Sequence, residues 1–206
     1  MAGARLITIE GLDGAGKTTV SAALRDSLAA RGIDVRLLRE PGGVRVAERI
    51  RSLLKDPELR LAPRAEALLF AAARAQLVQE AIEPLLSAGT WVLLDRFVDS
   101  SLAYQGAGRG LGMGAIREIN DFAIGEVFVD RTLLLLVEPS LGMARSSQRA
   151  DGRDRLEEED DAFRDRVAAG YLELAAADPH RIRTIDAGQD PEQVLADALA
   201  ALEDLV

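Results

Sequence analysis

Short apolar runs alternate with longer helix-like stretches along the whole of this 206-residue chain. Two of the runs, TWVLLD at residues 90–95 and TLLLLV at residues 132–137, are apolar without alternation, which is typical of strands that a parallel sheet buries on both faces. Parallel strands need crossover connections, and the helix-like stretches between the runs can supply them. The pattern therefore predicts an α/β fold with a doubly wound parallel sheet flanked by helices.

The boundaries of the expected elements follow from the same pattern. Gly32 and Gly89 each follow a helical pattern and are expected to end it. Residues 106–114 are rich in glycine and are expected to form the loosest interior segment. Since the sequence shows no repeat and no linker, we expect one domain over residues 1–206. Strands are expected at residues 5–10, 34–39, 90–95, 132–137 and 181–186, and helices at residues 17–31, 44–54, 63–87, 113–125, 156–177 and 191–205.

The composition excludes several classes of protein. The chain has 25 basic and 34 acidic residues and a net charge of −9, which disfavours binding to nucleic acid because a basic face must neutralise phosphates there. It has no Cys and a single His, His180, which excludes thiolate and multi-histidine metal sites. No signal peptide and no apolar run of membrane-spanning length is apparent, so we expect no membrane association and a cytoplasmic protein.

The strongest motif lies directly after the first expected strand. Residues 11–18 read GLDGAGKT and fit the pattern G-x-x-x-x-G-K-[ST] in full. The glycines let several backbone N–H groups surround a phosphate, and the positive end of the following helix points at the same anion. Lys17 can reach the β- and γ-phosphates of a nucleotide, and the Thr18 hydroxyl can ligate Mg²⁺. We expect a phosphate-binding loop formed by Gly11, Leu12, Asp13, Gly14, Ala15, Gly16, Lys17, Thr18 and Thr19.

This motif occurs in GTPases, in ATPase motors and in small-molecule kinases. Guanine-specific GTPases typically carry an N-K-x-D element, but the only Asn of this chain, Asn120, is followed by Asp121. Motors normally have longer chains. The size of the chain favours a small kinase, which needs a second site for the phosphate acceptor and cationic groups near the transferred phosphoryl.

Asp95 and Arg96 end the buried run TWVLLD, and ligands of open α/β sheets bind beyond the carboxyl ends of strands. Asp95 could orient Mg²⁺, directly or through water, and Arg96 could bind an acceptor phosphate bidentately. The alternative is a structural ion pair at the strand end. Lys17, Asp95 and Arg96 are therefore candidate catalytic residues, with Thr18 and Asp95 as the candidate metal ligands.

Phe70 and Arg74 are four residues apart on the longest predicted helix and so lie on one face of it. A ring beside a guanidinium can form the floor and the edge of a nucleobase pocket, whereas Phe70 taken alone would more often be plain core. Tyr104 and Gln105 follow the Asp-Arg segment and could line the same pocket.

Together these motifs resemble the thymidylate (dTMP) kinase family, in family order and over nearly the whole chain. The matching segments are EGLDGAGKTT at residues 10–19, REPGG at 39–43, RSLL at 51–54, LLFAAARAQ at 68–76, DRFVDSSLAYQG at 95–106 and DRLEEE at 154–159. One departure is Phe97, where the family more often has Tyr or His.

The resemblance implies a P-loop NTPase-type sheet of five parallel strands and a kinase that transfers the γ-phosphoryl of ATP to dTMP, giving dTDP in dTTP biosynthesis, with Mg²⁺. It also implies a homodimer, and it makes the phosphate loop the ATP site. The alternatives are another deoxynucleotide or nucleoside kinase on the same scaffold, and a nucleotide-binding regulator without transfer activity.

The resemblance also assigns roles to single residues. By position, Phe70 matches the residue that stacks on thymine, Arg74 the arginine at the base edge and Arg96 the arginine that binds the dTMP phosphate. The implied dTMP site comprises Asp13, Glu40, Pro41, Leu54, Phe70, Arg74, Arg96, Ser100, Ser101, Tyr104 and Gln105.

The resemblance further implies a lid over ATP at about residues 141–157. Some family members carry a catalytic arginine inside the phosphate loop, but residues 13–16 of this chain read DGAG. As in the bacterial form of the family, the lid is then expected to supply the arginine, which can be worth several powers of ten in rate. Arg149 and Arg153 are the candidates, with Arg145 and Arg155 as neighbours.

Overall fold

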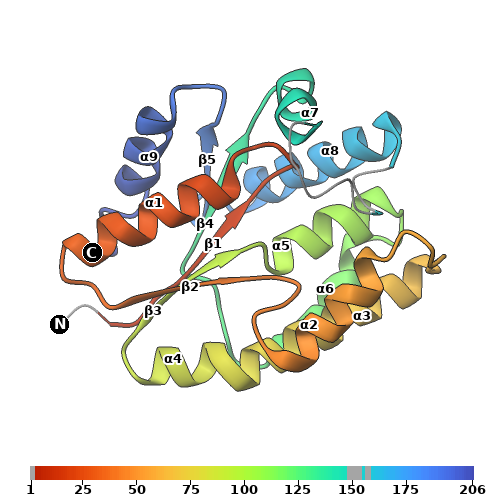
Figure 1. The fold of residues 1–206 in the computed structure, drawn as a ribbon, viewed down its shortest axis with the longest axis horizontal. Coiled ribbons are helices and arrows are strands. Elements are labelled where there is room, and N and C mark those ends of the chain that lie inside the picture. The colour runs from red at the N-terminus through yellow and green to blue at the C-terminus, as the bar shows by residue number, and fades with distance from the viewer. Residues whose placement is uncertain (1–2, 148–154, 156–158) are drawn as a thin grey trace.

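The computed structural model describes residues 3–147, 155 and 159–206, and these contain one five-stranded sheet (Figure 1). The strand order is β2-β3-β1-β4-β5, and every pairing is parallel. This confirms the predicted fold class, with a strand in each of the five expected places. The strands are β1 (Leu6–Glu10), β2 (Val35–Arg39), β3 (Trp91–Asp95), β4 (Arg131–Leu136) and β5 (Ile182–Asp186).

Helices form the crossovers between the strands. The predicted helix over residues 63–87 is continuous but contains π-helical turns, so it is divided into α3, η1 and α4. The helices are α1 (Lys17–Ala30), α2 (Arg45–Lys55), α3 (Pro63–Leu77), η1 (Val78–Ile82), α4 (Glu83–Ser87), α5 (Val98–Ser101), η2 (Leu102–Gly108), α6 (Met113–Ile124), α7 (Pro139–Ser147), α8 (Asp161–Ala177) and α9 (Pro191–Ala200).

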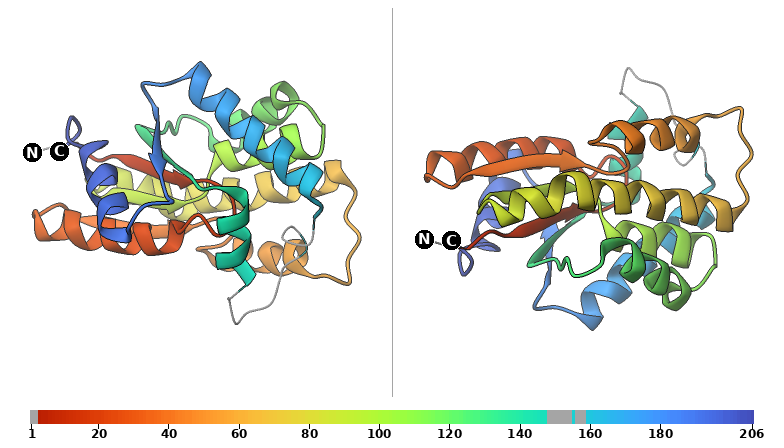
Figure 2. Two further views of the ribbon diagram at one scale, coloured as in Figure 1. Left: turned by 90° about the horizontal axis from the view of Figure 1, so that it is seen from above. Right: turned by 90° about the horizontal axis from the view of Figure 1, so that it is seen from below.

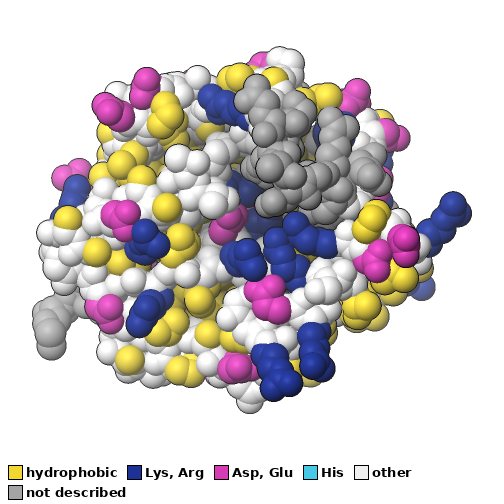
Figure 3. Space-filling view, viewed as in Figure 1, with side chains coloured by type: hydrophobic (Ala, Val, Ile, Leu, Met, Phe, Trp, Pro, Cys, Tyr) yellow, Lys and Arg dark blue, Asp and Glu magenta, His cyan; other side chains and the backbone are white. Residues whose placement is uncertain are grey.

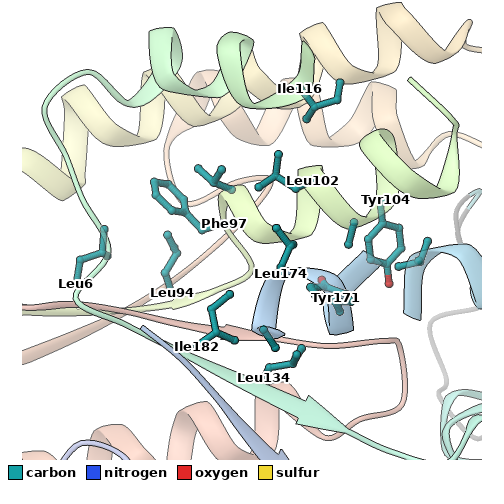
Figure 4. Packing of buried hydrophobic residues seen from close by; sticks show 14 of the residues in the cluster. Leu6, Leu94, Phe97, Leu102, Tyr104, Ile116, Leu134, Tyr171, Leu174 and Ile182 are labelled. Atoms are coloured by element: carbon teal, nitrogen blue, oxygen red, sulfur yellow. The ribbon is translucent and has the colours of Figure 1, made fainter. Parts of the chain in front are cut away.

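The sheet separates two hydrophobic cores because alternate residues of each strand point to opposite faces. On one face, Ile7 and Ile9 of β1 pack with Leu24 of α1 and Ala198 of α9. On the other face, Leu6 packs in a larger cluster with side chains of α3, η2, α6 and α8. Figures 1 and 2 show α1 and α9 on one side of the sheet and α3, α6 and α8 on the other, and Figure 4 shows the larger cluster from close by.

Two predictions about helices need correction. Residues 106–114 are predicted to form the loosest interior segment. In the structure this segment begins inside a helix, because α5 and η2 run without a break from Val98 to Gly108. Gly108 allows the helices to pack closely, since a Cβ at this position would come within 2.7 Å of the ring of Phe163 on α8. The helix predicted to begin at residue 156 begins at Asp161, because the Asp160 side chain caps it by accepting a hydrogen bond from Phe163 N.

The topology brings together three loops at the carboxyl edge of the sheet, one after each of the strands β1, β3 and β2. The central strand β1 leads into the phosphate loop, β3 ends at Asp95 and leads into Arg96, and β2 leads into Glu40. Backbone hydrogen bonds tie the ends of these strands, from Arg96 N to Ile9 O at 3.0 Å and from Glu40 N to Asp95 O at 2.9 Å. Among the described residues, no helix is long and apolar enough to cross a membrane. The cytoplasmic location expected from the sequence stays a prediction.

Candidate functional site

A cleft of about 560 Å³ opens at this carboxyl edge, between the phosphate loop and the helices α2, α3 and η2. Figure 3 shows Lys and Arg side chains gathered near the middle of this face of the molecule, which stands out on a chain with a net charge of −9. The cleft brings together most of the predicted site residues, namely Asp13, Lys17, Thr18, Glu40, Pro41, Leu54, Phe70, Arg74, Asp95, Arg96, Ser100, Ser101, Tyr104 and Gln105.

The phosphate loop adopts the backbone that its glycines allow. Gly11, Gly14 and Gly16 have φ values of 135°, 80° and 86°, a region that other residues rarely adopt. Helix α1 begins at Lys17, and among the described residues no side chain caps its N-terminus. The first N–H groups of the helix therefore have no side-chain cap, and their partial positive charge favours an anion.

Lys17 is held inside this loop. Its Nζ donates to Gly11 O at 3.0 Å and to Leu12 O at 2.8 Å. Burial, together with the positive charge of Arg96, lowers the pKa of Lys17 to about 8. A lysine whose charge is this poorly compensated gains strongly from an incoming polyphosphate.

Thr18 and Asp95, the two predicted metal ligands, are in contact within the cleft. The Thr18 Oγ1 donates to Asp95 Oδ2 at 3.2 Å. Both side chains offer the hard oxygen atoms that Mg²⁺ prefers. Within the described part of the chain, no group of three or more His, Cys, Asp or Glu could hold a metal ion.

Arg96 lies at the junction of the phosphate loop and the acceptor side of the cleft. It has a φ of 70° and is the one non-glycine among the described residues with a positive φ. Its Nη2 is 2.5 Å from Asp13 Oδ1, and its guanidinium lies 5.0 Å from the ring centroid of Tyr104. Burial alone would lower the pKa of Arg96, but the nearby Tyr104 and Asp13 outweigh it and raise the pKa. The ion pair of Arg96 is thus with Asp13 of the phosphate loop, and both residues line the cleft.

Phe70 and Arg74 both line the cleft from α3, as their spacing predicted. Arg74 is 1% exposed, and its donors are engaged within the protein. Its Nε donates to Glu40 Oε2 at 2.8 Å and its Nη1 to Ser101 Oγ at 3.0 Å. Further hydrogen bonds run to the Asn120 side chain and to Phe97 O. The guanidinium thus forms a fixed wall beside Phe70.

Phe97, the departure from the family pattern, is 1% exposed and packs in the larger core (Figure 4). The Arg74 guanidinium lies 5.2 Å from its ring centroid, within the range of a cation–π contact. A ring without a polar tip suits this buried position.

Glu40 faces Arg74 across the cleft wall. Among the described residues its Oε1 accepts no hydrogen bond although it is buried. Burial raises the pKa of Glu40 to about 7, against the opposing effect of Arg74. Glu40 is therefore a buried carboxyl group with one oxygen paired to Arg74 and the other without a hydrogen-bond partner among the described residues.

The predicted lid candidates divide into two groups. Arg149 and Arg153 lie outside the described residues. Arg145 on α7 donates to Ala187 O at 2.8 Å, and Arg155 Nη2 is 2.7 Å from Glu66 Oε2 on α3.

Several residues of the cleft were not found from the sequence. Arg51 and Lys55 of α2 line it, and Arg51 Nη1 donates to Pro41 O at 2.7 Å. Their spacing around Leu54, which the family resemblance placed in the pocket, is the signal that indicates one shared helix face. The remaining additions are Ser21, Leu37, Leu38, Arg39 and Gly43.

Comparison with known proteins gives a consistent result. The sequence model described as thymidylate kinase matches residues 9–198. The thymidylate kinase of Rhizorhabdus wittichii is 48% identical over 204 residues, 98% of each chain, and that of Halorhodospira halophila is 46% identical over 202 residues, 97% of this chain and 94% of that protein. The crystal structure of thymidylate kinase from Ehrlichia chaffeensis matches with a TM-score of 0.81 and 33% identity, over 98% of this chain and 99% of that one. The chain therefore belongs to the thymidylate kinase family.

Proposed function

We propose that this chain transfers the γ-phosphoryl group of ATP to dTMP within the cleft, giving ADP and dTDP for dTTP biosynthesis. An oxygen of the dTMP phosphate attacks the γ-phosphorus of ATP, and the bond from that phosphorus to the β–γ bridging oxygen breaks. The observation that carries the proposal is that one cleft is lined both by the phosphate loop and by the acceptor residues matched to the family.

The roles follow from the positions of the side chains. The loop amides and Lys17 would bind the ATP phosphates, and Arg96 would bind the dTMP phosphate beside them. Phe70 would stack on the base, with Arg74 as the fixed edge of the pocket. Catalysis would consist mainly of holding two anions in line for transfer.

Mg²⁺ would be held by Thr18 and Asp95 together with nucleotide oxygens. Support for this comes from the 3.2 Å contact between Thr18 Oγ1 and Asp95 Oδ2. When bound, the ion would neutralise charge on the β- and γ-phosphates.

We also propose that residues 1–206 form one P-loop kinase domain with a lid at about residues 141–157, and that Arg149 or Arg153 supplies the cation at the transferred phosphoryl. Arg149→Ala and Arg153→Ala, made singly, test the lid. At least one of them should lower kcat far more than it raises the KM for dTMP. Unchanged kcat in both would move the catalytic cation elsewhere in the protein.

A homodimer is proposed through the face formed by α3 and α6. Phe122 on α6 is 92% exposed and Leu68 on α3 is 56% exposed, and such an apolar surface favours burial against a second copy. Sizing at low concentration should show a dimer for the wild type and a monomer for Phe122→Asp. Leu172→Asp on α8, where Leu172 is 51% exposed, is the matched control and should remain dimeric.

An acceptor panel tests the activity itself. With ATP in excess, ADP release is followed with dTMP, dCMP, dGMP and thymidine as acceptors. We expect dTMP to give the highest kcat/KM by at least about tenfold. Equal rates with another acceptor would identify a different nucleotide kinase, and ATP binding without turnover on any acceptor would identify a regulator.

A further inference from the structure

Glu10, the last residue of β1, is a fully buried carboxylate that the roles above leave unused. It lies on the same face of β1 as Leu6, two residues after Thr8, and so points toward the larger core. A buried carboxylate is costly unless its oxygen atoms are hydrogen-bonded. Its position directly before Gly11 places it between the phosphate loop and the acceptor side of the cleft.

Three groups from different elements donate to this carboxylate. Phe97 N donates to Oε1 at 2.7 Å. Ser100 Oγ of α5 donates to Oε2 at 2.5 Å, and the Tyr171 hydroxyl of α8 donates to the same oxygen at 3.0 Å. Ser100 Oγ and the Tyr171 hydroxyl are themselves 2.9 Å apart. The carboxylate therefore joins β1 to the turn after β3, to α5 and to α8.

These contacts surround Arg96. Its positive φ is a conformation that costs about 1–2 kcal/mol outside glycine, so neighbouring groups must hold it. Consecutive residues of β1 do so: Ile9 O accepts from Arg96 N at 3.0 Å, and Glu10 accepts from the next amide of the turn, Phe97 N. The turn is thus fixed on both sides of the Arg96 α-carbon.

The side chain of Arg96 meets the same cluster. Its Nη1 donates to Ser100 Oγ at 3.2 Å and lies 3.5 Å from the Tyr171 hydroxyl. Both of these hydroxyls are held by Glu10, so their orientation toward the guanidinium depends on the carboxylate. Burial raises the pKa of Glu10, and the nearby positive charge of Arg96 partly offsets this effect.

We propose that Glu10 is a positioning residue that holds Arg96 in the orientation that binds the acceptor phosphate. The proposal rests on the role given above to Arg96. It assigns Glu10 to the dTMP side of the site, although in sequence it adjoins the ATP loop.

Steady-state kinetics of Glu10→Gln test the proposal, because glutamine keeps the shape but replaces one acceptor oxygen by a donor. We expect the KM for dTMP to rise about tenfold while the KM for ATP stays within about twofold. In an Arg96→Ala background the same change should add no further rise, because the residue that Glu10 positions is gone.

The control is Asp130→Asn. The Asp130 carboxylate accepts from Leu6 N and from Arg5 Nη1, both at 2.9 Å, at the opposite end of β1. Its loss should reduce stability and leave both KM values unchanged. If Glu10→Gln behaves in the same way, its role is merely structural and the proposal is overturned.

Tyr171→Phe is the milder variant should Glu10→Gln fail to fold. It removes one hydroxyl of the cluster, and we expect the KM for dTMP to rise about threefold with the KM for ATP unchanged. An unchanged KM for dTMP in Tyr171→Phe would then overturn the proposal. The roles of Arg96 and Glu10 can be disproved separately. An unchanged KM for dTMP in Arg96→Ala would disprove the role of Arg96. A raised KM for dTMP in Arg96→Ala together with an unchanged KM in Glu10→Gln would disprove only the role of Glu10.

Discussion

Gly14 of the phosphate loop and Gly142 of α7 are in backbone contact, and a Cβ added to Gly14 would overlap the Gly142 carbonyl. The loop that would hold the ATP phosphates thus packs on the first part of the segment proposed as the lid. The contact leaves no space for a side chain at Gly14, whereas a Cβ at Gly142 would lie 3.1 Å from Val137 Cγ1 and 3.2 Å from Asp13 O.

Gly14→Ala should therefore impair ATP use. A methyl group there must displace either the loop or α7, and we expect kcat/KM for ATP to fall at least about tenfold. Gly32→Ala is the matched control, because Gly32 has a φ of 81° but open space at its Cβ. It should lose only about 1 kcal/mol of stability from backbone strain and keep its kinetics. Equal kinetics in the two variants would contradict the importance of this contact.

Lys17→Ala should lower kcat by about 100-fold or more while the protein stays folded, because a cation directed at the transferring phosphoryl is lost. Circular dichroism and steady-state rates measure the two properties. Arg31→Ala at the exposed end of α1 is the control and should be fully active. A near-normal kcat in Lys17→Ala would disprove the role of the loop lysine.

The lowered pKa of Lys17 predicts a pH dependence. The lysine is charged below its pKa of about 8 and neutral above it, so kcat/KM for ATP should fall as the pH rises through about 8. Bound phosphates favour the charged form, so the decline in kcat should lie at higher pH. Lys17→Arg keeps its charge throughout this range and should show no decline near pH 8, whatever its rate. A flat wild-type profile from pH 7 to about 9.5 would count against this assignment.

The buried carboxylate of Glu66 leads us to expect a large loss of stability when it is replaced. It is fully buried on α3 and is contacted by Gln105 Nε2 at 3.0 Å, Arg109 Nη2 at 3.0 Å and Arg155 Nη2 at 2.7 Å. Burial works to raise the pKa of Glu66, but the hydrogen bonds from Arg109 and Gln105 outweigh it and lower the pKa. Glu66→Gln removes the charge from a buried pair and should cost about 3 kcal/mol in urea unfolding.

Glu48→Gln provides the comparison for Glu66. Its ion pair with Arg39, at 3.2 Å, has side chains 41% and 58% exposed, so its loss should cost less than about 1 kcal/mol. If the two variants lose the same stability, the buried network around Glu66 is not a special support of the fold.

Part of the cleft could be predicted from residues that are close in sequence, and the family resemblance added Glu40, Pro41, Leu54, Ser100 and Ser101. The spacing of Phe70 and Arg74 placed both on one helix face, and Asp95 and Arg96 followed directly from the end of an apolar run. The α5–η2 helix was missed because glycines weaken its helical pattern. Tertiary packing explains these glycines, since Gly108 leaves room for Phe163 of α8 and Gly106 lies against Met113 of α6.

By itself the sequence determined the parallel α/β sheet and the phosphate-loop motif, because strand burial, helix periodicity and a glycine-rich turn are properties of short segments. It also indicated the family, because several such motifs follow one another in the family's order along the chain. The tertiary structure decided what each charged side chain does. Arg74 meets Glu40 and Asn120 across 34 and 46 residues of chain, and Tyr171 reaches Glu10 across 161. Hydrogen bonds between such distant groups exist only once the sheet and helices have packed, because burial then forces each polar atom to find a partner.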